Sequence, residues 1–392
     1  MSNKIKNLFY SKQSISNEDI EKVVETLNST FLTQGPMVPE FEKKFADYSG
    51  AKYGVATNSA TSALHVACMA LDLGKGDWLW TSPNSFVASA NCGIYCGANV
   101  DFVDIDPKTY NISVNALEEK LKKAETEGRL PKIVIPVHYA GQSSEMEKIF
   151  ALSIKYGFKI IEDASHAAGA EYKEKKVGCC EYSHIAVFSF HPIKIITTIE
   201  GGMALTNDEN LAERLKRHKS HGITSDNRFM EPRKNDEIWN YQQITLGYNY
   251  RMTDVQAALG ISQLNRIDSF VSSRRNIAKF YDESLSSTGY ILPFQNGNTK
   301  SSYHLYPIRV NIEKCKKKQK DIYDYLEEAN IFANLHYIPI YRQPFFEKLG
   351  FKEGYCPESE AFHRETISIP VYPDLKKEDQ ERVISVLTEA LI

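Results

Sequence analysis

Small hydroxyl residues mark the first place in this chain where a ligand could bind. The segment TNSATSALH (57–65) ends a predicted strand and begins a predicted helix. Exposed N–H groups and hydroxyls at the N-terminus of a helix can bind a phosphate. An ordinary N-terminal helix cap would explain the same residues, so this segment does not establish a site by itself.

Two later strand ends supply a carboxylate and an amine. FKIIED (158–163) ends at Asp163, which suits a cofactor-binding group, an acid–base group or a simple helix cap. IAVFSF (185–190) runs into HPIKIITTIEGG, where Lys194 lies among apolar residues. Apolar surroundings can lower the pKa of a lysine and make its amine a nucleophile toward carbonyls. Most single lysines are solvated surface charges, so Lys194 is informative only together with its neighbours.

The order of these three features predicts a chemistry that none of them predicts alone. Pyridoxal phosphate (PLP) needs N–H and hydroxyl donors for its phosphate, an acidic partner for its ring nitrogen and an amine for its aldehyde. A helix start after the first predicted strand, a carboxylate at the end of the fifth and a lysine after the sixth follow one another here in that order. The sequence therefore favours a PLP site with Lys194 as the amine that forms a Schiff base with the cofactor.

The elements that must position these residues follow a βαβ pattern. Short apolar runs at 53–57, 78–81, 100–105, 132–137, 158–163 and 185–190 read as buried strands, and 60–71, 114–124 and 145–156 read as helices. Strands separated by helices of this length predict an α/β fold with a mostly parallel sheet. Ligands of such sheets bind at the carboxyl ends of the strands, which is where Asp163 and Lys194 lie.

Both ends of the chain also show helical patterns. Ser16 to Asp19 has the form of a capping box, and Ile20, Val23, Val24 and Leu27 follow at helical spacing. A long helical stretch is predicted from 253 to about 285, strands at 303–311 and 332–337, and helices at 317–329 and from 377. We expect a large domain over 1–265 that includes the N-terminal segment. A linking long helix and a small C-terminal α+β domain should occupy 266–392. The polar stretch around 224–235 is the best candidate for a mobile loop.

Composition limits the classes of protein that fit. With 392 residues and 42 % hydrophobic content, the chain can bury a large core. A formal net charge of −3 argues against a nucleic-acid or polyanion binder. We see neither a signal peptide nor an apolar run long enough for a membrane span, and expect a cytoplasmic protein. Seven scattered cysteines lack the clustered partners of a metal site, so we predict reduced core cysteines and no metal.

Segments along nearly the whole chain resemble the DegT/DnrJ/EryC1/StrS family of sugar aminotransferases. They are FLTQGPMVPEFE, NSATSALH, TSPNSFVASAN, VDIDPKTYNI, IEDASHAAGAEY, FSFHPIKIITTIEGGMALTND and LGYNYRMTDVQAALG, in the order of the family. The resemblance implies the type I (aspartate aminotransferase-like) PLP fold. Related dehydratases have histidine where this chain keeps Lys194, which favours transamination.

The resemblance also implies roles for individual residues. Lys194 would be catalytic, and seven residues would hold the cofactor. Ala60, Thr61 and Ser189 would bind the phosphate, Phe86 would stack on the ring, Asp163 would pair with the ring nitrogen, His166 would lie near the ring hydroxyl, and Asn249 would reach the phosphate of a neighbouring subunit. The last role implies an obligate homodimer.

Two C-terminal segments narrow the resemblance to one branch of the family. SSYHLYPI (301–308) and LHYIPIY (335–341) are similar to the branch that aminates a UDP-linked 4-keto-6-deoxy-N-acetylhexosamine at C4 during pseudaminic acid biosynthesis, with L-glutamate as donor. The residues implied near the sugar nucleotide are Tyr10, Thr33, Arg251, His304 and Tyr341. Ile338 stands where the second motif usually has lysine, which leaves the choice of sugar open.

Three other functions fit parts of the sequence less well. The chain could aminate a different nucleotide-linked keto sugar, including a dTDP-linked one. It could be a regulatory protein that keeps the fold without the chemistry, but the joint presence of Lys194 and Asp163 argues against that. A nicotinamide dehydrogenase is excluded because NSATSALH stands where a glycine-rich dinucleotide loop would be needed.

Overall fold

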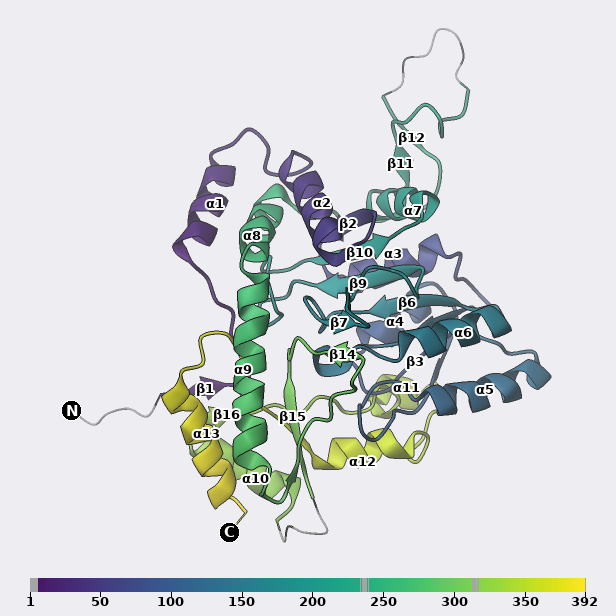
Figure 1. Ribbon diagram of the computed structural model, residues 1–392. Helices are drawn as coiled ribbons and strands as arrows, with labels where there is room; N and C mark the ends of the chain where they lie inside the picture. The colour runs from purple at the N-terminus through teal and green to yellow at the C-terminus, as the bar shows by residue number, and fades with distance from the viewer. Residues whose placement is uncertain are drawn as a thin grey trace.

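The computed structural model describes residues 6–391 except 233, 235–237, 239, 312–314 and 316 (Figure 1). Its centre is a seven-stranded sheet. The strand order is β2 (Tyr53–Thr57), β10 (Gly202–Thr206), β9 (Ile185–Ser189), β6 (Lys159–Asp163), β5 (Ile133–Ile135), β3 (Trp78–Thr81) and β4 (Asn99–Phe102). Every pairing is parallel except the two that β10 makes with β2 and β9. The predicted α/β fold with a mostly parallel sheet is confirmed.

Helices cover both faces of this sheet, which explains why its strands read as continuous apolar runs. In β5, Ile133 and Ile135 belong to one core and Val134 to the core on the opposite face. The first core lies under α3 (Ala60–Ala70), α4 (Ala88–Tyr95) and α7 (Glu209–Lys219). The opposite face is covered by α5 (Val114–Glu127) and α6 (Met146–Tyr156) at one end and by α2 (Met37–Ser49) and α8 (Asp254–Leu264) at the other.

The small antiparallel sheet near the C-terminus has a hydrophobic core of its own, the second core, which is separate from those on the two faces of the large sheet. The sheet has the order β13 (Tyr290–Ile291), β15 (Tyr306–Val310) and β17 (Thr366–Ile369), and α10 (Gln319–Glu328) and α13 (Lys377–Glu389) pack on it. The N-terminal strand β1 (Leu8–Phe9) joins this core by parallel pairing with β16 (Ile331–Phe332). The N-terminal segment thus contacts the C-terminal core, and the division at 265/266 stays a prediction.

Helix α9 (Ile267–Leu285) connects the two regions (Figure 1). Its first residues, among them Ile267 and Phe270, belong to the core beside the large sheet, and its later residues, among them Ile277 and Tyr281, belong to the second core. The predicted helical stretch from 253 to about 285 is present, but a short turn at 265 and 266 divides it into α8 and α9. Arg266 has a non-helical backbone, with φ −112° and ψ 3°. Neighbouring N–H groups reach back three residues to Ser262 and Gln263, as in a turn.

The predicted strand at 332–337 is also much shorter than expected. After β16 the chain makes one isolated bridge, between Asn334 and Ser368, and then leaves the sheet. His336, Tyr337 and Ile338 instead line a cavity. Alternation of apolar and polar residues in FANLHY could not distinguish a strand from a segment that buries side chains around a pocket.

The remaining elements are short. β7 (Glu171–Tyr172), β8 (Lys175–Lys176) and β14 (Thr299–Lys300) form a small sheet, and η1 (Tyr139–Gly141), η2 (Ile340–Arg342), α11 (Pro344–Glu347) and α12 (Pro357–Glu365) are connecting helices. β11 (Ile223–Thr224) and β12 (Gln242–Gln243) form a hairpin that projects from the body in Figure 1. The predicted mobile loop connects these strands, and its residues 233 and 235 lie outside the described part.

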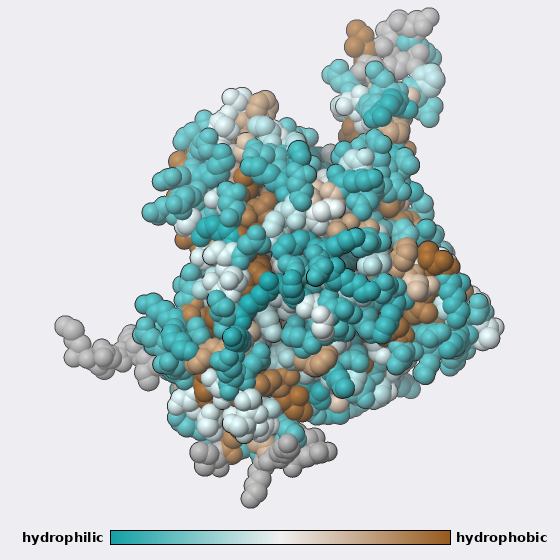
Figure 2. Space-filling model, in the orientation of Figure 1, coloured by the Kyte–Doolittle hydropathy of each residue, from teal (hydrophilic) through white to brown (hydrophobic). Residues whose placement is uncertain are grey.

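The surface seen in Figure 2 is mainly hydrophilic, with small separate hydrophobic patches. Within the described residues, the structure contains no helix with the length and apolar content needed to cross a bilayer.

The predicted capping box of α1 (Asn17–Leu27) is confirmed and leads into a buried polar network. The Ser16 N–H donates to Asp19 Oδ2 at 2.9 Å, and the Asp19 N–H donates to Ser16 Oγ at 3.4 Å. The fully buried Asp19 carboxylate also accepts hydrogen bonds from Ser262 Oγ and Gln263 Nε2, both at 2.6 Å, and pairs with Arg266. Asp19 thereby fixes α1 to α8 and to the break that follows it.

Replacing Asp19 by alanine is expected to destabilise the protein by about 2–4 kcal/mol, because three donors and a cation would lose their shared acceptor. Urea unfolding followed by circular dichroism would measure the change. Glu21→Ala, an exposed site on the same helix, is the matched control and should stay within about 0.5 kcal/mol of the wild type. Equal stabilities for the two variants would show that the Asp19 network contributes little.

Candidate active site

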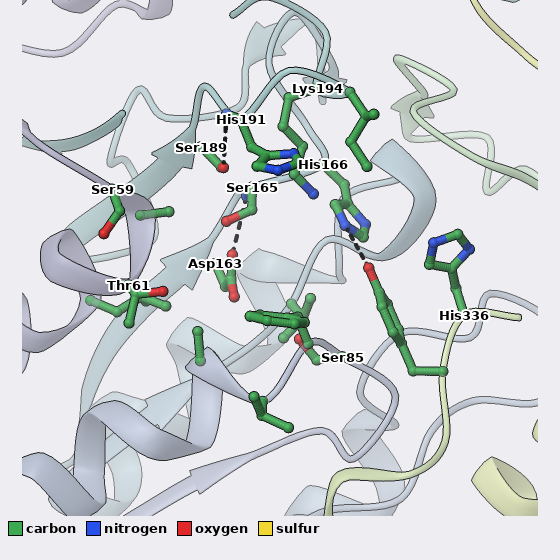
Figure 3. A pocket seen from close by; sticks show the side chains of 18 of the residues that line it. Ser59, Thr61, Ser85, Asp163, Ser165, His166, Ser189, His191, Lys194 and His336 are labelled. Atoms are coloured by element: carbon green, nitrogen blue, oxygen red, sulfur yellow. Dashed lines mark hydrogen bonds between the residues drawn. The ribbon is translucent and has the colours of Figure 1, made fainter. Parts of the chain in front are cut away.

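A cavity of about 700 Å³ opens at the carboxyl ends of the parallel strands (Figure 3). It receives residues from the ends of β6 and β9, from the start of α3, from the segment after β3 and from the segment after β16. Eight of the thirteen predicted site residues line it: Tyr10, Ala60, Thr61, Phe86, Asp163, His166, Ser189 and Lys194. The structure thus brings the predicted helix start, carboxylate and lysine into one cavity.

The start of α3 offers hydrogen-bond donors to this cavity. The Ser59 hydroxyl caps the helix by accepting from the Ser62 N–H at 3.1 Å. The N–H groups of Ala60 and Thr61 belong to the first turn, where no acceptor exists within the helix. A Cβ on Gly202 of the neighbouring β10 would lie 2.6 Å from the Ala60 nitrogen, so only glycine permits this close approach. With the Thr61 and Ser189 hydroxyls on the same wall, this corner suits a phosphate.

A fixed carboxylate lies opposite the helix start. Asp163 ends β6, accepts from Ser89 Oγ at 2.6 Å through one oxygen and from the Ser165 N–H at 3.1 Å through the other. The Ser85 and Ser89 hydroxyls are 2.7 Å apart and extend the chain of hydrogen bonds. The Phe86 ring, 60 % exposed, lines the same cavity. An oriented carboxylate and a free aromatic face could hold a flat, protonated heteroaromatic ring.

His166 is held as a neutral imidazole. Its Nδ1 accepts from the Ala140 N–H at 3.3 Å, and its Nε2 lies 3.2 Å from the Tyr337 hydroxyl. Burial, followed by the charge of Lys194, lowers the pKa of His166 well below its usual range. Because Nδ1 accepts a hydrogen bond, the proton of the neutral ring lies on Nε2. His166 can therefore accept no further bond at Nδ1 and donates from Nε2.

Lys194 supplies an amine that titrates near neutral pH. Burial lowers the pKa of Lys194 to about 8, and the Asp163 carboxylate opposes this effect. The Lys194 Nζ lies 3.4 Å from the Nε2 of His304. In Figure 3 the side chains of Lys194, His166 and Asp163 converge on the same cavity. A lysine with such a pKa can act both as a nucleophile and as a proton carrier.

Three of the predicted site residues do not line the cavity. The exposed Thr33 makes a backbone bridge to Thr253. The exposed Asn249 bridges Ser220, whose hydroxyl accepts from Arg251 Nη1 at 3.1 Å. The roles of Thr33, Arg251 and Asn249 toward a sugar or a second subunit stay predictions.

Two further predicted site residues contact other side chains of the protein. His304 is absent from the described cavity wall, and its Nε2 lies 3.4 Å from the lysine amine. Tyr341 is fully buried, and its hydroxyl donates to Glu360 Oε1 at 2.6 Å. A direct contact between Tyr341 and a nucleotide sugar is not supported by this arrangement, because its side chain offers no accessible surface.

The cavity also contains residues that the sequence did not single out. They are mostly polar or aromatic: Ser59, Ser85, Ser165, His191, Glu200, Asn334, His336, Tyr337 and Gln343. Ser85 and His336 lie within segments that carry the family resemblance, which was the available signal. Ile338 lines the cavity with 47 % of its side chain exposed, so an apolar group occupies the position where the resemblance leads one to expect lysine.

Comparison with known proteins connects this geometry to a family. The sequence model of the DegT/DnrJ/EryC1/StrS aminotransferase family matches residues 13–388. The chain is similar to the UDP-4-amino-4,6-dideoxy-N-acetyl-β-L-altrosamine transaminase of Campylobacter jejuni serotype O:2. The two are 38 % identical over 387 residues, which cover 98 % of this chain and 97 % of the relative.

Solved structures agree with the sequence comparison. Helicobacter pylori PseC, an aminotransferase involved in the biosynthesis of pseudoaminic acid, superposes with a TM-score of 0.88 at 33 % identity, covering 98 % of this chain and 99 % of PseC. The PLP form of the putative sugar aminotransferase Spr1654 from Streptococcus pneumoniae gives 0.86 at 27 % identity, with 98 % of each chain covered. The family and the PLP-form neighbour imply PLP, and the donor corner, fixed carboxylate and amine of the cavity fit the parts of that cofactor.

Amine labelling would test the environment of Lys194 directly. In cofactor-free protein, the rate at which acetic anhydride acetylates Lys194 should rise with pH and reach half its maximum near pH 8. The sign follows from burial, which disfavours the ammonium and leaves more free amine below the usual titration range. Mass spectrometry of the Lys194 peptide measures the rate, and exposed lysines such as Lys12 provide the internal control. A midpoint for Lys194 as high as that of exposed lysines would contradict the prediction.

Proposed function

This chain belongs to the DegT/DnrJ/EryC1/StrS aminotransferase family, and we propose that it aminates C4 of a UDP-linked 4-keto-6-deoxy-N-acetylhexosamine. The product would be UDP-4-amino-4,6-dideoxy-N-acetyl-β-L-altrosamine, with L-glutamate as the donor and PLP as the cofactor. The observation that carries the proposal is the meeting of Lys194, Asp163 and the start of α3 in one cavity. The likeness to the Campylobacter jejuni transaminase and to PseC supports the choice of sugar.

The proposal includes the type I (aspartate aminotransferase-like) fold, with a large domain over 1–265 and a linking helix and smaller α+β domain over 266–392. The cavity lies where such a division would place it. The ends of the central strands form one wall, and the segment after β16 forms another. Tyr10, near the N-terminus, completes the second wall.

The residues proposed to bind the cofactor would contact its phosphate and its ring. Ala60 and Thr61 would donate to the phosphate, with the Ser189 hydroxyl beside them. Asp163, held by two hydrogen bonds, would keep the ring nitrogen protonated. Phe86 would cover one face of the ring, and His166 would lie near the ring hydroxyl. When bound, PLP supplies an electron sink that stabilises negative charge on the carbon bearing the amino group.

Lys194 would move the protons of both half-reactions. In the first half-reaction its Nζ would take a proton from the α-carbon of glutamate and pass it to the cofactor. In the second it would take that proton back and deliver it to C4 of the sugar. A pKa near 8 lets the amine accept and release a proton at neutral pH. The neutral His166 next to it adds no second positive charge that would hold the lysine permanently deprotonated.

Ile338, at the end of the cavity proposed to bind the sugar, is the residue that favours an alternative substrate. Tyr10, Asn334, Ile338 and Gln343 line this end. Burial raises the pKa of Tyr10, so its hydroxyl remains a neutral donor. Ile338 offers apolar surface and no cation, which could suit a different hydroxyl pattern or a different nucleotide. Another nucleotide-linked keto sugar, including a dTDP-linked one, is therefore the second candidate.

We also propose that the enzyme is a cytoplasmic homodimer. On α1, Ile20, Val24 and Leu27 form a stripe at helical spacing and are 54 %, 48 % and 53 % exposed. The inner side of this helix instead carries the buried Asp19. An apolar stripe that faces outward while a carboxylate faces inward supports the proposal that a second copy of the chain covers the helix. Asn249 would then reach the phosphate site of the neighbouring subunit.

Charges on this stripe are expected to separate the subunits. Ile20→Glu combined with Val24→Glu should convert a dimer into a monomer in multi-angle light scattering, because burying two carboxylates in an apolar interface is unfavourable. Ile154→Glu is the matched control, since Ile154 is an exposed isoleucine on α6. A wild-type protein that is monomeric and fully active would rule out the obligate dimer.

The two half-reactions can be followed in the visible spectrum of the cofactor-loaded protein. L-glutamate should remove the band of the lysine-bound cofactor, and the UDP-linked keto sugar should restore it. Lys194→Ala should abolish turnover and retain some cofactor binding, because the phosphate and ring contacts remain. Bleaching by glutamate without recovery by the UDP sugar, but with recovery by a dTDP-linked keto sugar, would favour the second candidate. Full activity of Lys194→Ala would end the assignment.

A further inference from the structure

Arg274 is a fully buried cation for which the described residues provide no carboxylate partner. It lies on α9, and its Nη1 donates to three backbone carbonyls: Val371 at 2.7 Å, Tyr303 at 3.3 Å and His304 at 3.3 Å. Burial lowers the pKa of Arg274 to about 9. An unpaired buried charge destabilises a fold, so its presence requires a reason other than stability.

The residue that Arg274 holds is the one that contacts the lysine amine. His304 is buried, with its Nε2 3.4 Å from Lys194 Nζ and its ring centroid 4.3 Å from that of His166. Burial, together with the charges of Lys194 and Arg274, lowers the pKa of His304 well below its usual range. The imidazole is thus neutral and can accept a hydrogen bond from the lysine ammonium at Nε2.

Only one nitrogen of the His304 ring has a hydrogen-bond partner among the described residues. Within the part of the chain that the structure describes, His304 Nδ1 is buried without a hydrogen-bond partner. Nε2 is therefore the ring atom with a defined partner, and that partner is Lys194. Of the charged or titratable groups around the amine, Asp163 and His166 lie on the sheet side and His336 on the segment after β16. His191 lies on the same segment as Lys194, just after β9.

We propose that His304 is a positioning residue whose Nε2 holds the Lys194 amine at the wall of the cavity, and that Arg274 fixes the backbone of His304 in that place. The inference rests on the proposed function, in which Lys194 moves protons at two carbon atoms. It replaces the sequence-based interpretation of His304 as a sugar contact.

A neutral acceptor is suited to this task for a physical reason. A lysine side chain has many rotamers, and a hydrogen bond to a fixed acceptor restricts them. A carboxylate in the place of His304 would also restrict them, but it would raise the pKa of the amine strongly. An imidazole kept neutral by burial and by the charge of Arg274 orients the amine and leaves it able to lose its proton near neutral pH.

The neighbouring Arg275 provides a matched control. It lies on the same helix and holds the same segment, with Nε donating to the Ser301 carbonyl at 2.8 Å and Nη2 to the Lys300 carbonyl at 3.1 Å. Its contacts are made before His304 in the chain and do not include that residue. Loss of Arg275 should loosen the segment without moving the group that touches Lys194.

The first measurement is the pH dependence of Lys194 acetylation in cofactor-free protein. His304→Leu and Arg274→Met should both lower the midpoint by about half a pH unit or more, because an acceptor of the ammonium is lost or displaced. His304→Gln, which keeps an acceptor, and Arg274→Lys, which keeps a buried cation, should lie closer to the wild type. Arg275→Met should match the wild type. Unchanged midpoints in both His304→Leu and Arg274→Met would overturn the proposal.

The second measurement separates positioning from substrate binding. In steady-state assays, His304→Leu should lower kcat by roughly tenfold or more, with KM for the sugar and for glutamate unchanged. It should also slow the bleaching by glutamate, a half-reaction in which no sugar takes part. A raised KM for the sugar with normal bleaching by glutamate would restore the sugar-contact interpretation and refute ours.

The design keeps this inference separate from the proposed function. Shifted acetylation midpoints in a protein that fails to aminate any UDP-linked keto sugar would sink the proposed function and support the positioning role of His304. Circular dichroism checks the folding of each variant. If Arg274→Met does not fold, His304→Leu against His304→Gln decides the question.

Discussion

The Lys194 amine must be shielded from water well enough to lose its proton near pH 8, and it must also remain accessible to a substrate. Burial alone lowers the pKa of Lys194, while the nearby Asp163 works in the opposite direction. The surrounding histidines are all kept neutral by burial, so they line the amine without repelling its charged form. The rest of the fold must therefore maintain both the burial of the amine, which lowers its pKa, and the one nearby carboxylate, which opposes that effect.

The parallel sheet supplies the rigid half of that environment. Because β6 and β9 are adjacent and parallel, Asp163 and Ser189 end at the same edge, and the loop after β9 carries Lys194 to it. The antiparallel β10 brings Gly202 against the start of α3 on the neighbouring side. The second half of the wall comes from segments associated with the C-terminal core, so neither region forms the cavity alone.

The sequence predicted best what depends on neighbours along the chain. Strands, the capping box at Ser16 and the three chemical groups at strand ends follow local patterns, and the parallel order of the sheet follows from their alternation with helices. The break at Arg266 was not predicted, and Asp19, which pairs with Arg266, lies far away in sequence. The contact of His304 with Lys194 joins residues about a hundred positions apart. Arg274 supports His304 through backbone carbonyls. Neither interaction leaves a pattern in the sequence. The role of Tyr341 toward a sugar stays a prediction: a motif specifies a residue type and not the direction in which the side chain points, and here the side chain is fully buried.

The parallel pairing of β1 with β16 has a consequence for the order in which the protein can be completed. Tyr10 of the cavity wall follows β1, and its backbone bonds to Phe332 at 2.9 Å and to Val371 at 3.0 Å. Tyr10 can therefore take its place in the wall only after Phe332 and Val371 have been synthesised. The central sheet can assemble earlier, but the cavity closes only when these later residues are available. Contacts of such wide sequence separation form slowly, so a truncated or stalled chain would contain the lysine and lack the wall that encloses it.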